Sequence, residues 1–162
     1  MELSRFNALT PGGHEAITRQ VGLLLEDYQV YQQYVQQLRW DRRLRPFLDF
    51  SGKIQQLYGA AEFGKTVVAE HLITMGHTPS VMGSTLLPSP SRMQVPAQVQ
   101  HFDDAVRSIL RATRQLLETV RETYMLATQY QDKRTAHLMA QLAQQLGIAL
   151  TVFSGVRSAA YN

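Results

Sequence analysis

Four long segments of this chain repeat their apolar residues at helical spacing, and almost no segment alternates as a β-strand does. In the first, about residues 13 to 39, the steps alternate between four and three residues: Ile17, Val21, Leu24, Tyr28, Tyr31, Val35 and Leu38. This spacing places one apolar stripe along one face of a helix. Helices of this kind are stabilised by packing against one another, so we expect an all-α protein.

The other three segments follow the same rule. The second spans about residues 47 to 75 and ends before Gly76. Its stripe is Phe47, Phe50, Ile54, Leu57, Ala61, Gly64, Val68, Leu72 and Met75. The third follows Pro96 and reaches about residue 130, with the stripe Phe102, Val106, Ile109, Leu116, Val120, Tyr124 and Ala127. The fourth follows Asp132, a favourable N-cap, with the stripe Thr135, Met139, Leu142, Leu146, Leu150 and Phe153.

Three glycines interrupt the second segment, and each lowers helix propensity by roughly 1 kcal/mol relative to alanine. They are Gly52, Gly59 and Gly64. Such glycines are tolerated where a neighbouring helix approaches closely, so we expect close packing against this segment.

The lengths of the connections predict the topology. Short loops join the first segment to the second and the third to the fourth, which makes each pair antiparallel neighbours. The second and third are separated by the proline- and serine-rich residues 80–96, and a short helix is expected near residues 81–87. Two helical hairpins joined by one long crossover form a ferritin-like four-helix bundle. We expect residues 1–162 to form this single domain.

Composition excludes several classes of function. The chain has no cysteine, so disulfides, thiolate metal sites and cysteine nucleophiles are absent. The N-terminus lacks a basic stretch followed by an apolar core, and the apolar runs are shorter than a membrane span, so we expect a cytoplasmic protein without a membrane partner. A net charge of +3 is too small to indicate nucleic-acid binding by itself.

The residues for familiar catalytic chemistry are missing. Ferritin-like bundles usually hold two iron ions with a Glu-x-x-His pattern on two helices, and this sequence contains no Glu-x-x-His. The fourth segment has no internal carboxylate, and there is no nucleophile elbow or phosphate-binding glycine loop. The histidines are scattered without metal-ligand spacing: His14, His71, His77, His101 and His137. We expect no metal pair in the bundle core, and the residues favour a protein without enzymatic activity without deciding the question.

Several short motifs occur in one register along the chain. They are Leu24-Leu25-Glu26-Asp27, Arg39-Trp40-Asp41, Phe47, Leu57-Tyr58, Ala69-Glu70-His71-Leu72, Met75-Gly76, Pro79 and Asp132-Lys133-Arg134-Thr135-Ala136. In these motifs and in its long crossover the chain resembles the Dps family of mini-ferritins, the DNA-binding proteins from starved cells. The resemblance implies a hollow homo-oligomer, a dodecamer, in iron homeostasis and the stress response. It also implies iron oxidation at sites shared by two-fold-related subunits, with histidines from one chain and carboxylates from the other.

Four of the five ligand positions that the resemblance implies hold other residues. The first histidine falls on Arg39, and the second falls on Ser51. The acid four residues later falls on Gln55, and the aspartate of the second helix falls on Thr66. Only the glutamate remains, as Glu70. An arginine cannot lose its proton or bind a cation, so we expect iron oxidation to be lost or weakened and Arg39 to pair with Glu70 of a neighbouring subunit.

At other positions that the resemblance implies, the charge of the residue also differs from that in the family. Acidic residues that line the three-fold pores of the family correspond to Thr128, Lys133 and His137. A ring of Lys133 side chains would repel Fe(II). The candidate DNA contacts are basic: Arg39, Arg42, Arg43, Arg45 and Arg157.

Three hypotheses follow. The first is a Dps-like cage without efficient iron oxidation, which protects the cell by associating with DNA or by storing another cargo. The second is an active ferroxidase that holds iron with non-standard ligands drawn from Asp49, Glu62 and Glu70, of which Glu70 is the main candidate. The third is a small ferritin-like dimer that binds a partner protein. No cofactor is expected under the first hypothesis, and iron is expected only where a site is retained.

Overall fold

The computed structural model describes residues 11–79, 93–96 and 98–159, apart from the side chains of residues 11 and 157–159. Its four helices are α1 (Pro11–Trp40), α2 (Leu48–Thr74), α3 (Phe102–Gln129) and α4 (Lys133–Ala159), and the described residues contain no strand. The all-α, four-helix prediction is confirmed. The short helix expected near residues 81–87 lies outside the described residues.

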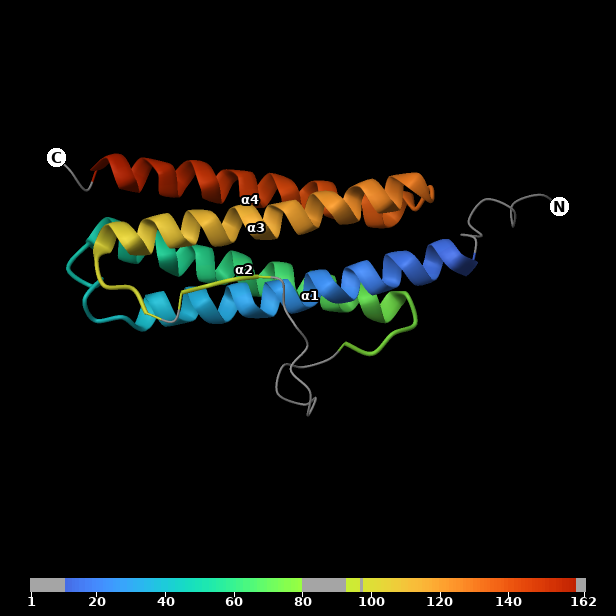
Figure 1. Ribbon diagram of the computed structural model, residues 1–162, viewed down its shortest axis with the longest axis horizontal. Helices are drawn as coiled ribbons and strands as arrows, with labels where there is room; N and C mark the ends of the chain where they lie inside the picture. The colour runs from blue at the N-terminus through green and yellow to red at the C-terminus, as the bar shows by residue number, and fades with distance from the viewer. Residues whose placement is uncertain (1–10, 80–92, 97, 160–162) are drawn as a thin grey trace.

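The helices form one bundle with ferritin-like connections. In Figure 1, α1 and α4 run in one direction, and α2 and α3 run in the other. Helix α1 packs against α2 and α3, and α4 packs against α3 and α2. Helices α2 and α3, which the long connection joins, are thus parallel, as its length predicted.

The core contains the predicted stripes with two corrections. All seven predicted positions of α1 are buried. Phe47 is 41% exposed because it lies just before α2, although its ring stacks on Phe102 at a centroid distance of 4.1 Å. Tyr124 is 42% exposed, and Thr123 is buried in its place. The buried positions Leu116, Val120, Thr123 and Ala127 alternate steps of four and three residues, whereas the prediction took two successive steps of four because Tyr124 is the larger apolar side chain.

Gly64 is the one glycine of α2 against which another helix packs closely within the described chain. A Cβ at this position would lie 2.5 Å from Cε1 of Tyr28 on α1. Nothing lies within 4 Å of a Cβ built on Gly52 or Gly59. The expected close approach is therefore confirmed at Gly64, where the absent side chain makes room for the Tyr28 ring.

Buried polar contacts connect α1 to α3, and sequence periodicity did not predict them. The Tyr31 hydroxyl lies 2.9 Å from Thr113 Oγ1, and Thr119 Oγ1 donates to Asp27 Oδ2 at 2.7 Å. The Tyr34 hydroxyl also contacts Ser108. Buried polar groups need partners, so these contacts hold α1 and α3 in one register.

Helix α4 has the length and composition of a candidate membrane span over Lys133–Val156, with a mean hydropathy of 1.2. The core helix of a soluble bundle meets the same criteria. Its buried residues Thr135, Met139, Leu142 and Phe153 form part of the bundle core or of its polar contacts. We therefore describe α4 as a bundle helix.

Candidate functional site

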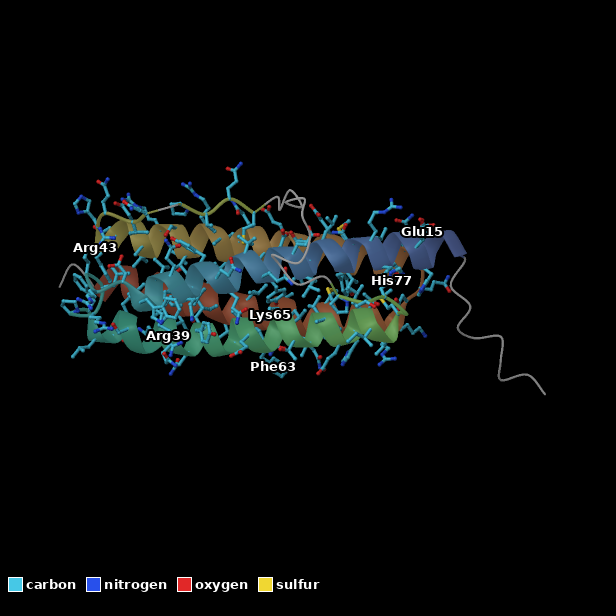
Figure 2. All side chains as sticks on the ribbon, turned by 90° about the horizontal axis from the view of Figure 1, so that it is seen from below. Glu15, Arg39, Arg43, Phe63, Lys65 and His77 are labelled. Atoms are coloured by element: carbon cyan, nitrogen blue, oxygen red, sulfur yellow. The ribbon has the colours of Figure 1, made fainter. Side chains whose placement is uncertain are left out.

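Arg39 lies in the last turn of α1 and is half-buried against α2. Its Cζ atom is 4.8 Å from the centre of the Tyr58 ring, a distance typical of cation–π contacts. Its Nη1 also donates to Gln36 Oε1 at 3.5 Å, which is a weak hydrogen bond. Figure 2 shows Arg39 beside α2, with Phe63 and Lys65 farther along the bundle. A permanent cation is therefore held at the position that the resemblance assigns to the first iron ligand.

Arg39, Ser51 and Gln55 come together around one hollow of about 330 Å³, which we call the Arg39 pocket. The pocket is lined by Leu38, Arg39, Trp40, Asp41, Leu44, Arg45, Phe50, Ser51, Ile54 and Gln55. Ser51 Oγ donates to the carbonyl of Leu44 at 3.4 Å. Three of the five ligand positions that the resemblance implies therefore lie around one pocket.

The carboxylate of the Arg39 pocket is already paired. Arg43 Nε and Nη2 donate to the two oxygens of Asp41 at 3.0 and 2.7 Å, and the backbone N–H of Arg43 adds a third bond at 3.0 Å. The hydrogen bonds from the Arg43 side chain lower the pKa of Asp41 below its ordinary value. Asp41 is thus ionised and neutralised by Arg43, whereas Arg39 and Arg45 have no ion pair with any described residue.

Thr66 and Glu70 lie elsewhere on α2, in a second hollow of about 320 Å³, which we call the Glu70 hollow. Both residues are exposed, and Thr66 Oγ1 donates to the carbonyl of Glu62 at 3.0 Å. Lys65 lines the same hollow and donates from Nζ to Gln32 Oε1 at 2.5 Å. Within one chain Arg39 and Glu70 therefore line different hollows, and their expected pairing across two subunits stays a prediction.

Metal ligands do not cluster in the described part of the chain. No group of three or more His, Asp or Glu side chains could hold a metal ion there. Of the candidate ligands of a non-standard site, Asp49 is bound by Lys53 Nζ at 2.8 Å, and Glu62 and Glu70 are exposed. Among the described residues these three carboxylates therefore form no common site within one chain.

The predicted pore residues lie near the turn between α3 and α4. Thr128, Lys133 and His137 are all exposed, and Thr128 Oγ1 donates to the carbonyl of Tyr124 at 2.9 Å. Lys133 and His137 are separated by one helical turn on α4. Their exposure leaves both side chains available to a neighbouring subunit.

The basic residues proposed for DNA contact differ in their surroundings. Arg42 and Arg45 are exposed in the loop between α1 and α2, and Arg43 is paired with Asp41 in the same loop. Arg39 is half-buried on Tyr58. The side chain of Arg157 lies outside the described residues.

Two residues of the site were missed by sequence reasoning. Tyr58 lies one turn after Gln55 on α2, and this spacing was a readable signal that both face the same side. Lys65 adds a second cation on α2 beside Thr66 and Glu70. Lys65 favours anionic neighbours over a metal ion, and the Tyr58 ring holds the cation of Arg39 in place.

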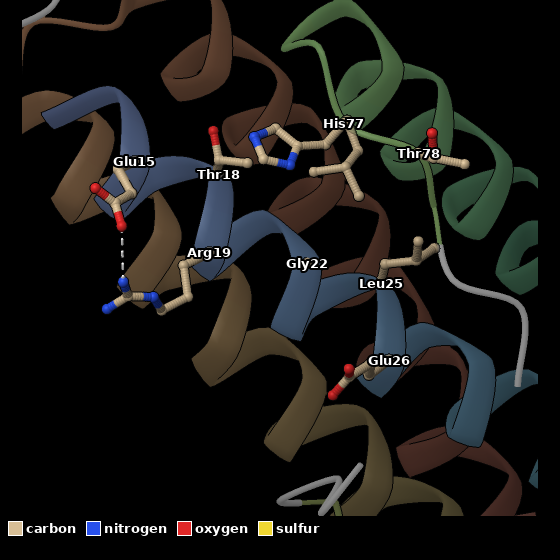
Figure 3. Close-up of a pocket in the computed structure, with 9 residues that line it drawn as sticks. Glu15, Thr18, Arg19, Gly22, Leu25, Glu26, His77 and Thr78 are labelled. Carbon is tan, nitrogen blue, oxygen red and sulfur yellow. Dashed lines mark hydrogen bonds and ion pairs between the residues drawn. The ribbon is translucent and has the colours of Figure 1, made fainter. Parts of the chain in front are cut away.

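A third hollow, of about 290 Å³, lies between α1 and the segment after α2 (Figure 3). Gly22 widens it, and His77 and Thr78 close one side. Glu15 and Arg19 form an exposed ion pair at its edge, with a distance of 3.2 Å. This hollow contains none of the predicted site residues.

Comparisons with known proteins agree on the fold. No family model matches the chain. An uncharacterized protein of Haemophilus influenzae is 24% identical over 139 residues, which is 86% of each chain. The Dps protein of Vibrio cholerae O1, described as a member of a superfamily of ferritin-like diiron-carboxylate proteins, superposes with a TM-score of 0.77 at 16% identity, over 89% of this chain and 90% of that one. The chain has the Dps fold.

Two further solved structures superpose equally well. Antigen TpF1 of Treponema pallidum gives a TM-score of 0.78 at 15% identity, over 93% of this chain and 97% of that one. The Dps protein of Listeria monocytogenes gives 0.77 at 16% identity, over 86% and 91%. The resemblance read from short sequence motifs is thus confirmed at the level of the four-helix fold.

Proposed function

We propose that this Dps-fold protein assembles into a hollow homo-oligomeric cage, a dodecamer, in which the iron-oxidation site shared between subunits is lost. The fold supports the proposal over most of the chain. Large apolar side chains are also exposed on α2, including Leu48 (81%), Phe63 (57%) and Ile73 (58%). Exposed apolar residues gathered on one helix are typical of a surface that another protein covers, and a second copy is the simplest occupant.

The observation that carries the loss of iron oxidation is the position of Arg39. Its guanidinium lies on the Tyr58 ring, and Arg39 lines the same pocket as Ser51 and Gln55. Fe(II) binds oxygen and imidazole donors, and a guanidinium offers only N–H groups and a fixed positive charge. The positive charge of Lys65 in the Glu70 hollow also opposes the binding of Fe(II). Both halves of the former site therefore disfavour a cation.

The remaining role is protection of the cell under stress by association with DNA or by storage of another cargo in the cytoplasm. The charge of +3 per chain amounts to about +36 over a dodecamer, and many weak contacts to phosphate add up. Arg42 and Arg45 are exposed cations that could make such contacts. Iron would be substrate or cargo only if Glu70 and a second copy supplied a site.

Two measurements test the proposal. Native mass should show a closed oligomer of the dodecamer's size, and oxygen-dependent oxidation of Fe(II), followed by absorbance, should stay near the rate without protein. Rapid oxidation by the purified oligomer would favour a ferroxidase with non-standard ligands. A stable monomer or dimer at micromolar concentration would overturn the cage and favour the small partner-binding dimer.

A further inference from the structure

From the geometry of the Arg39 pocket we infer that it binds a small organic phosphate carrying a flat aromatic ring, of the size of a mononucleotide. Arg39 and Arg45 would bind the phosphate, and Trp40 would stack on the ring. The inference goes beyond the cage function and depends on residues of a single chain. Three features of the pocket carry it: its charge, its hydrogen-bond donors, and its shape.

The first feature is an excess of positive charge in a small space. Arg39 and Arg45 line the pocket without an acidic partner among the described residues, and the one lining carboxylate, Asp41, is held by Arg43 through both oxygens. Arg39 is half-buried on Tyr58, so its position is fixed before a ligand arrives. A fixed guanidinium is suited to binding a phosphate with paired N–H donors.

The second feature is a polar wall beside these cations. Ser51 and Gln55 line the pocket from the first turns of α2. The Ser51 hydroxyl makes only a long bond to the carbonyl of Leu44, at 3.4 Å, and Gln55 is exposed. Neither side chain makes a strong hydrogen bond to any described residue, so both can bind oxygens or ring nitrogens of a ligand.

The third feature is the shape and the apolar lining. The volume of about 330 Å³ lies at the lower end of the range of roughly 300–1,000 Å³ that is common for small-molecule sites. Leu38, Leu44, Phe50 and Ile54 line its inner part. Trp40 is 65% exposed at its edge, where an indole can stack on an aromatic base. The pocket therefore suits one ring and one phosphate, not a longer chain.

The inference is compatible with a contact between Arg39 and Glu70 of a second copy. A guanidinium carries several N–H donors, of which Gln36 accepts one weakly. A carboxylate and a phosphate can therefore share Arg39, with Arg45 bound to the phosphate alone.

The experiment uses Trp40, the single tryptophan of the chain, as an internal reporter. The full-length protein is titrated with adenosine 5′-monophosphate, and quenching of tryptophan fluorescence is recorded. Parallel titrations use adenosine, inorganic phosphate and a short single-stranded oligonucleotide. Saturable quenching by the mononucleotide is expected, with weaker binding of adenosine and of phosphate, because each provides only half of the contacts.

Variants identify the site. Arg45→Gln should weaken binding by about 10-fold to 100-fold, the value of one charge-assisted hydrogen bond, and Arg39→Gln should do the same. Arg42→Gln is the matched control, because Arg42 lies in the same loop outside the pocket lining. Equilibrium dialysis of Trp40→Leu should show weaker binding of the mononucleotide. The inference is overturned if adenosine binds as tightly as its phosphate, if only the oligonucleotide binds, or if Arg42→Gln loses as much affinity as Arg45→Gln.

Discussion

The Nε2 atom of His71 on α2 lies 2.7 Å from Thr135 Oγ1 on α4, and both side chains are buried. Thr135 Oγ1 donates to Asp132 Oδ2 at 2.5 Å, and the backbone N–H of Thr135 donates to Asp132 Oδ1 at 3.1 Å. Because the threonine proton is used by Asp132, Nε2 of His71 must carry the proton that Thr135 accepts. The predicted N-cap of α4 is thus confirmed, and it is connected through Thr135 to α2.

The first prediction is a loss of stability in mild acid through His71. Burial lowers the pKa of His71 below its ordinary value of 6.5, and Arg134 adds to this effect while Asp132 opposes it. The unfolded chain therefore takes up a proton before the folded chain does. The contribution of His71 to stability is complete above about pH 6.5 and decreases as the pH falls through this value.

The measurement is the urea midpoint of unfolding as a function of pH. His71→Gln should flatten the change between neutral pH and the folded-state pKa of His71. His77→Gln, at an exposed position after α2, should retain the change of the native protein. Equal slopes for His71→Gln and the native protein would show that another group causes the effect.

A second prediction concerns Thr135 itself. Thr135→Val keeps the shape of the side chain and removes the hydroxyl between His71 and Asp132. A buried donor without its acceptor costs about 1–3 kcal/mol, so the free energy of unfolding should fall by this amount. Thr151→Val is the matched control, because Thr151 is exposed on the same helix and bonds only to the carbonyl of Gly147. Its effect should stay within about 0.5 kcal/mol.

The third prediction compares two glycines in helices. Gly64→Ala would place a methyl group 2.5 Å from the Tyr28 ring, so we expect destabilisation of about 1–3 kcal/mol. Gly147→Ala on α4 meets nothing within 4 Å and should stabilise the protein by about 0.5–1 kcal/mol through helix propensity. Thermal unfolding of both variants should show a lower midpoint for Gly64→Ala and a higher midpoint for Gly147→Ala. A neutral Gly64→Ala would mean that Tyr28 moves aside without cost.

The fold was largely predictable because apolar spacing and connection lengths are local properties of the sequence. All seven stripe positions of α1 are buried, as predicted. The stripe was wrong at Tyr124, because a large apolar side chain was preferred there over Thr123, which continues the regular spacing and is buried through its hydrogen bond to the carbonyl of Thr119. The contact between Asp27 and Thr119 was not foreseen, because it joins residues 92 positions apart that periodicity cannot pair.

The candidate site was predictable only in part. The register of the motifs placed Arg39, Ser51 and Gln55 together, and the structure brings them to one pocket. The contact of Arg39 with Tyr58 depends on how α1 packs on α2. The spacing of apolar residues does not specify which individual side chains meet there. Pairing between subunits was predicted from family resemblance alone and needs a second chain to be observed.

The fourth prediction is that iron binding can be partly restored. Arg39→His combined with Thr66→Asp replaces a cation with an imidazole and adds a carboxylate one turn before Glu70. Oxygen-dependent Fe(II) oxidation by this variant should exceed that of the native protein. Arg39→Gln alone is the control, because it removes the charge without supplying a metal ligand. If the control oxidises iron as fast as the double variant, the added ligands are not the cause.

The last prediction concerns Arg39 and Glu70 of a neighbouring subunit. In one chain Glu70 is exposed in its own hollow, and Arg39 has no carboxylate partner among the described residues. The Dps arrangement would bring the two together across a two-fold axis, where a paired guanidinium and carboxylate fit well. If that contact is buried, Arg39→Gln or Glu70→Gln alone leaves one charge unpaired and should weaken the dimer by roughly 3–5 kcal/mol.

Native mass over a dilution series measures the effect, with the exposed Glu62→Gln as control. Exchange of the two charges, in Arg39→Glu with Glu70→Arg, should recover much of the association because the pair is re-formed in reverse. If the exchanged variant is as weak as either single variant, the two residues do not meet in the assembly.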